Sequence, residues 1–462
     1  MKLCEKRCHH DLTPSALNLL PFLISHLIKK YYLQGMGFPE EFLHYVWRFK
    51  SFDFSNLRCT DETPLSILNV GLLNQHSGPD FSQGKIQIAD TIWVGNIEIH
   101  LKSSDWLRHN HQIDPAYDNV ILHVVFEHDA EIERKDGTLL PVLELKGRIA
   151  PSLIERYADL CLNLNSFPCS AQIGSIDKFI VDAFLSRTVI ERFEQKAELL
   201  SKSLAQLNGN WDEAFYHSLA GNFGFKVNAL PFELFAKSLP QQIYAKHKEN
   251  PLQIEALVFG TAGFLNDIFT EEYPQKLKRE FEFLKKKYNL APLQPGIWKF
   301  MRMRPQNFPT IRLAQFAALI LKTNHLFSKI LNIKDPTALR TLFEGLPVNP
   351  YWKTHYHFKK EAVAVSTQIG RSSIDNVLLN TVALFLFAYG KYTDTGAYVH
   401  RAIKLLEQLP AENNAITTSF INAGVQLEHA FASQGAIQLK KTYCEEKKCL
   451  LCGIGIKILK QT

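Results

Sequence analysis

Residues 79–102, PDFSQGKIQIADTIWVGNIEIHLK, decide the fold expected for the first part of this chain. Within this stretch, Lys85–Ala89 and Ile92–Leu101 alternate apolar and polar side chains, which is the pattern of half-buried β-strands. Asp90 and Thr91 between them suit a tight turn. The stretch therefore predicts a β-hairpin.

The segments on either side extend this hairpin into a sheet. Leu65–Leu73 has the composition of a strand, and the nearly continuous apolar run Val120–Glu127 suits a central strand covered on both faces. The other expected elements are a helix at Pro39–Phe49, a helical segment at Asp105–Asn119, and a hairpin that turns at Lys135–Thr138 and returns through Leu140–Leu145. We therefore expect a domain of strands and helices over residues 38–150.

The pattern beyond Cys169 is helical. Apolar residues such as Leu185, Val189 and Phe193 recur at three- and four-residue spacing. Further helices are expected at Pro251–Asn266, Pro274–Tyr288, Ile311–Leu331, Ile374–Tyr389, Ala397–Leu409 and Ile421–Lys441. The predicted fold class is α+β, with a helical extension at 1–37, the domain at 38–150, and a large all-helical domain over 170–462.

The composition excludes several classes of protein. The 462 residues are too many for one ordinary core, and 46% apolar with 21% charged residues is typical of globular chains. A formal net charge of +6 permits a basic patch but does not identify a nucleic-acid-binding protein. The longest apolar stretch, Val377–Gly390, is shorter than the roughly 18 residues of a membrane span and predicts a buried helix. Pro21 and His26 interrupt an N-terminal apolar run, so we expect a cytoplasmic protein that does not bind membranes.

The residues that carry chemistry lie on and beside the hairpin. Asp80 follows a Gly-Pro turn, and Glu98, His100 and Lys102 alternate along one strand, so these three side chains share a face. Buried charges on a sheet are costly unless they are paired or bind a metal. An Asp and a Glu from neighbouring strands can hold a hard divalent cation, and a nearby Lys or His can deprotonate the attacking water. This chemistry suits phosphodiester hydrolysis; in the alternative, Asp80 caps the turn and Glu98 pairs with Lys102 on a solvated face.

These residues resemble the signature of the PD-(D/E)XK nuclease superfamily, the restriction-endonuclease-like fold. Pro79-Asp80 matches its first part, and Glu98-Ile99-His100 matches its second part after a hairpin of suitable length. The resemblance implies a mixed sheet flanked by helices, Asp80 and Glu98 as ligands of Mg²⁺ or Mn²⁺, and metal-dependent cleavage of DNA or RNA. His100 stands in place of the superfamily's lysine, a departure that makes Lys102, one step along the same face, a second candidate for that role.

The wider pattern also resembles a bacterial family of full-length proteins whose function is not established, through the motifs GPDF, GNIEIHLKSSDW, HNH and VILHVV. Two other functions therefore stay open. One is a nucleic-acid-binding or assembly protein that kept the fold and lost turnover with the replacement of the lysine. The other is a hydrolase of a small phosphorylated substrate that uses the same carboxylates with His109 and His111.

A second polar cluster flanks the hairpin. We expect Gln75, Trp106, His109 and His111 to contact the substrate. On a helix, side chains two residues apart point about 200° apart, so His109 and His111 can share a metal only from extended or loop backbone. The alternative is that both imidazoles are hydrogen-bonded groups that fix the turn.

Three cysteines lie close together near the C-terminus: Cys444, Cys449 and Cys452. Thiolates at this spacing can converge on zinc or on an iron–sulfur cluster, which normally takes four protein ligands. Cys169 or Cys161 can return as the fourth, which predicts a structural metal site that closes the helical domain. Reduced cysteines without a metal are the alternative.

Arg302 and Arg304 lie in a segment that alternates basic and aromatic residues, WKFMRMRPQNFPTIR at 298–312. Guanidinium groups bind phosphates and aromatic rings stack on exposed bases, so this segment is a candidate surface for nucleic acid, the partner we expect. Its prolines also suit a structural loop whose aromatics pack in the core, and that is the interpretation we favour. The sequence leaves the oligomeric state open.

Overall fold

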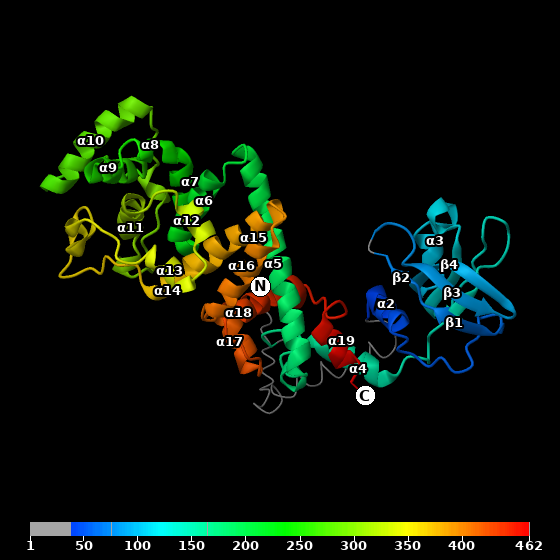
Figure 1. Cartoon of the computed structure of the whole chain (residues 1–462). Helices are drawn as coiled ribbons and strands as arrows, with labels where there is room; N and C mark the ends of the chain where they lie inside the picture. The colour runs from blue at the N-terminus through cyan, green and yellow to red at the C-terminus, as the bar shows by residue number, and fades with distance from the viewer. Residues whose placement is uncertain (1–37, 75, 164, 462) are drawn as a thin grey trace, which may run out of the picture. The chain divides into compact units, whose positions relative to one another are not determined.

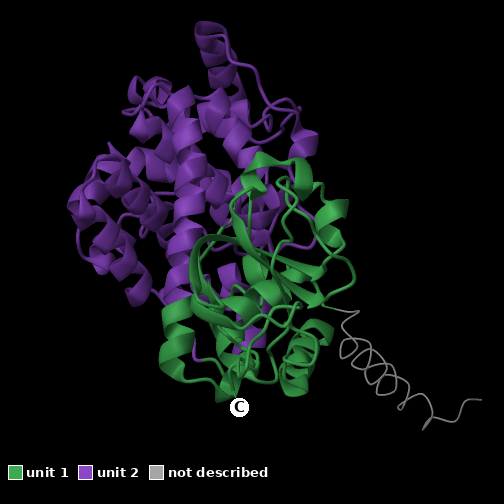
Figure 2. Ribbon diagram, turned by 90° about the vertical axis from the view of Figure 1, so that its right-hand side faces the viewer, with its two compact units in different colours: residues 1–184, 422–425, 440–462 green, residues 185–421, 426–439 purple. Residues whose placement is uncertain are grey.

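The computed structural model describes residues 38–74, 76–163 and 165–461, and its helices and strands are labelled in Figure 1. The chain forms two compact units, coloured separately in Figure 2. Unit 1 comprises Met1–Phe184, Asn422–Val425 and Lys440–Thr462, and unit 2 comprises Leu185–Ile421 and Gln426–Leu439. The helical extension predicted at 1–37 lies outside the described residues. The C-terminal segment joins unit 1, whereas the sequence pattern had grouped it with the helical domain.

Unit 1 is built on a mixed sheet. Its strands are β1 (Leu65–Asn69), β2 (Leu72–Leu73), β3 (Phe81–Ile88), β4 (Thr91–Lys102), β5 (Val120–Glu127) and β6 (Val142–Glu144). Their order is β1-β3-β4-β5-β6, with β2 paired to β3. β1, β3 and β4 are antiparallel neighbours, while β4, β5 and β6 are parallel. The predicted α+β class, with a mixed sheet in the N-terminal unit, is confirmed.

Gly71 divides the strand predicted at Leu65–Leu73 into β1 and β2. It has a φ of +89°, and a Cβ at this position would lie 2.6 Å from the carbonyl oxygen of Ser82. Left-handed backbone pressed against a neighbouring strand favours glycine. The chain bends here, and β2 then pairs with the start of β3.

Helix α2 (Glu40–Arg48) packs against β4 and matches the helix expected at Pro39–Phe49. Two glutamates occupy its first turn, where they suit the helix dipole. Its apolar face buries Phe42, Leu43 and Val46 completely. This burial fixes α2 beside the strand that carries Glu98 and His100.

The helical segment expected at 105–119 consists of three short pieces. They are α3 (Asp105–Arg108), η1 (His111–Ile113) and η2 (Pro115–Tyr117). The break lies at Asn110, whose φ of 61° is left-handed. Asparagine adopts this conformation more readily than most residues, because its short polar side chain can bond locally. The chain therefore changes direction between His109 and His111.

The end of the chain returns to unit 1. Among the described residues, this unit also contains the α-helices α4 (Pro151–Leu162) and α19 (Gly453–Leu459). Arg156 Nη2 donates to the carbonyl of Leu459 at 3.2 Å, and Lys447 Nζ donates to the carbonyl of Cys161 at 2.8 Å. These bonds hold the C-terminal cysteine segment against α4.

Unit 2 is helical around one large core, in which Phe232, Phe235, Phe259 and Trp352 are completely buried. Its helices are α5 (Lys178–Gln206, which begins in unit 1), α6 (Trp211–Phe223), α7 (Phe225–Ser238), α8 (Gln241–Ala245), α9 (Pro251–Thr261), α10 (Glu272–Tyr288), α11 (Pro309–Lys322), α12 (Leu326–Asn332), α13 (Pro336–Thr341), α14 (Arg371–Val377), α15 (Ala383–Tyr392), α16 (Gly396–Gln408), α17 (Ala415–Asn422, which ends in unit 1) and α18 (Ala430–Leu439).

Two details of unit 2 differ from the sequence expectation. A short β7–β8 hairpin (His355–His357 and Lys360–Glu361) interrupts the all-helical pattern. The helix expected at Ile421–Lys441 begins only at Ala430, because the chain turns at Gly424, whose φ is +91°.

The apolar run Val377–Gly390 lies in a continuous helical stretch, Arg371–Tyr392. By length and composition alone, this 22-residue stretch could cross a membrane. However, 72% of its most apolar window is buried inside the protein. It is therefore the core helix that the sequence predicts.

Candidate metal centre

Asp80 and Glu98 meet in unit 1. The backbone N–H of Asp80 donates to Glu98 Oε2 at 3.1 Å, and the backbone N–H of Ile99 donates to Asp80 Oδ2 at 2.9 Å. The antiparallel pairing of Phe81 with Ile97 brings the two residues side by side. The structure thus brings together the two carboxylates that the sequence singled out.

Helix α2 adds Glu40 and His44, which sequence reasoning missed. His44 Nε2 lies 3.2 Å from Asp80 Oδ2 and 4.0 Å from Glu40 Oε1. One ligand atom from each of Glu40, His44 and Asp80 lies within 4.8 Å of the others. The four-residue spacing of Glu40 and His44 on a predicted helix was an available signal, because such residues share one helix face.

The electrostatics of this group suit a cation. Burial, followed by the charge of Asp80, raises the pKa of Glu98 to about 8 and that of Glu40 to about 7. Burial works against the charged form of His44, but its hydrogen bond to Asp80 and the charges of Asp80 and Glu40 prevail and raise its pKa. Carboxylates crowded in a buried place repel one another unless a positive charge lies between them. The ligand atoms of Glu40, His44 and Asp80 lie close enough together to hold one cation, and Glu98 is joined to this group by its hydrogen bond from the Asp80 N–H.

His100 is buried and lies between two other imidazoles, the buried His123 and the exposed His109. Its Nδ1 is 2.9 Å from His123 Nε2 on β5, and its Nε2 is 3.1 Å from His109 Nδ1. Burial, followed by the charges of the neighbouring histidines, lowers the pKa of His100 to about 2 and that of His123 to about 3. This lowered pKa favours a neutral His100 ring, which would not supply the positive charge of the lysine in the signature that the sequence resembles.

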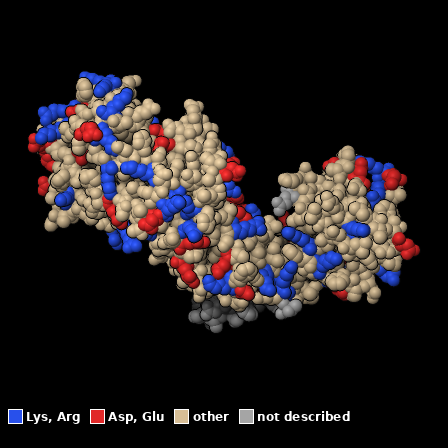
Figure 3. Space-filling view, in the orientation of Figure 1, with Lys and Arg blue, Asp and Glu red and all other residues tan. Residues whose placement is uncertain are grey.

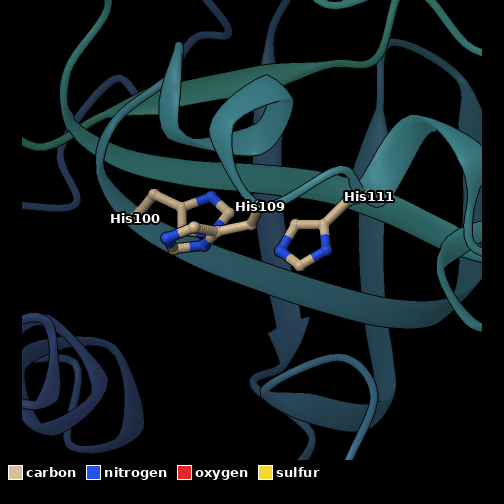
Figure 4. A group of neighbouring side chains, drawn as sticks. All are labelled: His100, His109 and His111. Carbon is tan, nitrogen blue, oxygen red and sulfur yellow. The ribbon is translucent and has the colours of Figure 1, made fainter.

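His109 and His111 both turn toward His100, as Figure 4 shows. The left-handed Asn110 between them supplies the non-helical backbone that a shared site requires. His111 Nε2 lies 3.3 Å from Glu98 Oε1, and the Tyr117 ring stacks on the His111 ring with centroids 3.7 Å apart. The histidine pair is thus part of the same centre as Glu98.

Two other predicted residues, Lys102 and Trp106, do not join this centre. Lys102 extends toward solvent, with its Nζ 3.8 Å from Glu127 and 3.7 Å from Asp129. Trp106 is only 5% exposed and packs against His111 and His123, so its ring is not open for a base to stack on it. Gln75 lies outside the described residues.

Residues 40–415 match the family model described as Protein of unknown function (DUF2851). The chain belongs to the DUF2851 family. The DUF2851 match begins at Glu40, a residue of the centre, and ends before the three C-terminal cysteines. No curated protein and no solved structure matched the chain. The expected membership of a family without an established function is confirmed, and the resemblance to PD-(D/E)XK nucleases stays a prediction.

A second cluster of this DUF2851 protein consists of cysteines in unit 1. Cys169, Cys444, Cys449 and Cys452 are all buried. Burial, then the charges of Cys444, Cys452 and Cys449, raise the pKa of Cys169 far above its ordinary value. Cys161, half-buried, acts electrostatically on Cys449. The charges of all three C-terminal thiols act on Cys169, which keeps Cys169 a candidate for the fourth ligand.

Arg302 and Arg304 belong to unit 2. They line a hollow together with Lys226, Arg312, and several amide and hydroxyl groups. Arg312 is buried and hydrogen-bonded to Gln315 at 3.0 Å, so it is a structural residue, as the sequence interpretation favoured for this segment. Arg302 and Arg304 are exposed side chains at the rim.

Proposed function

We propose that this protein is a metal-dependent nuclease, with Asp80 and Glu98 as ligands of Mg²⁺ or Mn²⁺. The observation that carries the proposal is the pair of backbone hydrogen bonds that hold Asp80 and Glu98 side by side, from the Asp80 N–H to Glu98 at 3.1 Å and from the Ile99 N–H to Asp80 at 2.9 Å. The order of helix α2, three antiparallel strands and a parallel strand supports the resemblance to PD-(D/E)XK nucleases.

The residues around the pair have separate roles in this proposal. A divalent cation bound there would polarise the phosphodiester and lower the pKa of the attacking water. Glu40 would accept a hydrogen bond from that water, because its side chain reaches the same group of atoms as Asp80. His44, charged next to Asp80, would supply the positive charge that a neutral His100 cannot.

The test is cleavage of labelled DNA and RNA by the purified chain with Mg²⁺ or Mn²⁺. We expect cleavage that a chelator abolishes and that Asp80→Asn and Glu98→Gln each reduce by more than about 100-fold. Asp129→Asn is the matched control, because Asp129 is a carboxylate of the same unit that pairs with Lys102 and Ser104. Absence of cleavage under all metal conditions would remove the catalytic part of the proposal.

A second candidate is a nucleic-acid-binding protein without turnover. It is favoured by the basic hollow of unit 2, where Lys226, Arg302 and Arg304 lie near one another. Figure 3 shows, by contrast, that Lys and Arg on the face shown lie among Asp and Glu, so overall charge marks no binding surface. Binding that Asp80→Asn leaves unchanged and Arg302→Ala weakens, without cleavage, would support this candidate. Preferential hydrolysis of a small phosphoester would instead favour the third function, a hydrolase of small phosphorylated substrates.

We also propose that Cys169, Cys444, Cys449 and Cys452 bind one structural metal, either a zinc ion or an iron–sulfur cluster. All four are buried, and burial followed by the charges of its neighbours raises the pKa of Cys449 to about 12. Thiols crowded in this way stay protonated unless a metal ion displaces the protons. The site would tie the C-terminal segment to the segment after α4. Its test is the zinc and iron content of the protein with Cys169 replaced.

A further inference from the structure

The atoms that face one another around His100 have the separations that a bound transition metal requires. His100 Nε2 is 3.1 Å from His109 Nδ1, and Glu98 Oε1 is 3.5 Å from His100 Nε2 and 3.3 Å from His111 Nε2. The three histidines each offer a ring nitrogen within 4.8 Å of the other two. Ligand atoms at about 2.0–2.1 Å from a tetrahedral zinc ion lie about 3.4 Å from one another. The separation between His100 and His109 and the two separations from Glu98 are close to this value, and a nitrogen of His111 lies within 4.8 Å of the other two histidines.

One of these nitrogens, His111 Nε2, makes no hydrogen bond among the described residues, although it faces Glu98 Oε1 at 3.3 Å. His111 is only 9% exposed. The Tyr117 ring stacks on the imidazole at an interplanar angle of 20° and holds it with this nitrogen toward Glu98. Buried polar atoms are nearly always satisfied, so an unpartnered one indicates a missing ligand, a water or an ion.

A partner on the far side of His100 completes the arrangement. His123 is fully buried and lies on β5 beside Glu98. Its Nε2 is 2.9 Å from His100 Nδ1. A hydrogen bond at the second ring nitrogen fixes which nitrogen a ligating histidine turns toward its metal. In the tautomer of His100 that carries its proton on Nδ1, this nitrogen would donate to His123, and the lone pair of Nε2 would face His109 and Glu98.

We propose that His100, His109 and His111 bind a zinc-class transition-metal ion at a site separate from the one proposed at Asp80. Glu98 would lie between the two sites, because its Oε1 faces the histidines and its Oε2 faces the Asp80 N–H. Imidazole ligands suit Zn²⁺, Fe²⁺ or Ni²⁺ and do not suit Mg²⁺. Three histidines leave a coordination position open, as in catalytic zinc sites, and the exposed His109 places that position next to solvent. Only the use of this ion in phosphodiester hydrolysis rests on the proposed function; its binding does not.

The experiment measures zinc content after the full chain is stripped with a chelator, reloaded with Zn²⁺ and desalted. It compares the wild type with His109→Ala, His128→Ala and Asp80→Asn. His109 is exposed, so its replacement creates no buried cavity. His128 is the matched control in the same unit, because it bonds Ser103 at 3.0 Å and Glu131 at 3.3 Å, outside the cluster.

We expect wild type and His128→Ala to hold one zinc equivalent more than His109→Ala. The affinity for that ion should fall by more than about 100-fold in His109→Ala, because even the outer partners of metal ligands contribute about 10- to 100-fold. Loading with Co²⁺ gives a second measurement, a visible absorption band that His109→Ala removes and His128→Ala retains. Circular dichroism of each variant shows that the fold is kept.

Asp80→Asn separates this inference from the proposed function. Zinc retained in Asp80→Asn, with no cleavage by any of the proteins, would leave the histidine site standing and overturn the nuclease. Equal zinc content in wild type and His109→Ala would overturn the histidine site. If Asp80→Asn loses the zinc equivalent and His109→Ala keeps it, the histidine site would also be overturned, because the zinc ion would then be bound by the carboxylates. An equal loss in His128→Ala and His109→Ala would overturn it as well.

Discussion

The backbone N–H of Asp80 donates to the carboxylate of Glu98, and this bond crosses between two antiparallel strands. Glu98 lies on β4 and Asp80 directly precedes β3, so the pairing of these strands positions both acidic residues. A site built on strands keeps its geometry when no ligand is bound, which lowers the cost of binding. This rigidity makes the centre suitable for single-residue tests.

Lys102→Ala should leave cleavage within about twofold of wild type. The Lys102 ammonium pairs with Glu127 and Asp129 at the surface, and such exposed pairs contribute at most about 1 kcal/mol. The measurement is the rate of metal-dependent cleavage, with Asp80→Asn as the inactive reference. If the cleavage rate of a folded Lys102→Ala variant falls by more than about tenfold, the prediction is wrong, and Lys102 would act as the catalytic lysine of the PD-(D/E)XK signature.

Asn110→Gly should keep zinc binding, while Asn110→Val should weaken it by about tenfold. The φ of 61° at Asn110 turns both neighbouring histidines to one side. Glycine adopts this conformation freely, whereas left-handed backbone costs an ordinary residue roughly 1–2 kcal/mol of conformational free energy. Competition with a zinc indicator measures both affinities. Identical affinities in the two variants would show that the turn does not position the histidines.

Because of Glu255 in unit 2, we expect the free energy of unfolding to fall as pH rises. Burial outweighs its hydrogen bonds from Tyr273 and Asn349 and raises its pKa to about 7 from a value of 4.5. The folded protein therefore holds a proton that the unfolded chain releases, so the contribution is complete below about pH 4.5 and is lost as pH rises through 7. The loss is on the order of 3 kcal/mol.

The measurement for Glu255 is urea unfolding at several pH values between 4.5 and 8. Glu255→Gln should show a shallower fall, since its amide stays neutral and still accepts hydrogen bonds. Glu249→Gln, an exposed glutamate of the same unit, is the control and should follow the wild type. Parallel curves for wild type and Glu255→Gln would contradict the prediction.

Cys169→Ser should remove the metal of the cysteine cluster. Cys59→Ser is a matched control, because Cys59 is also buried in unit 1 and the neighbouring charge that acts on it is that of Asp61. Elemental analysis distinguishes one zinc from several irons, and visible absorption identifies an iron–sulfur cluster. Unchanged metal content in Cys169→Ser, with Cys161→Ser depleted, would give the fourth position to Cys161.

The sheet and its acidic pair were predictable because alternation of side chains along a strand is a local property. Glu98 and His100 both lie on β4. The turn before Asp80 brings Asp80 to the start of the neighbouring strand, β3. The partners of Lys102 were not predictable. The two-residue alternation along a strand predicts the face on which a side chain lies, but it does not predict which groups a long side chain contacts.

The remaining parts of the centre depend on packing between distant segments. His44 reaches Asp80 only because α2 docks on β4, and His123 reaches His100 only because β5 pairs beside β4. The joint orientation of His109 and His111 depends on one left-handed residue, which no apolar periodicity reveals. The grouping of the C-terminal cysteines with unit 1 is likewise a tertiary property.

The return of Lys440–Thr462 to unit 1 affects the order of folding during translation. The sheet leaves the ribosome first, but the last segment of its unit is made only after all of unit 2 has been synthesised. Unit 1 therefore stays incomplete while unit 2 is synthesised, and chaperones and proteases can reach its interior during that time. A deletion or a fusion near the carboxyl end of the chain would therefore disturb unit 1 before it disturbs unit 2.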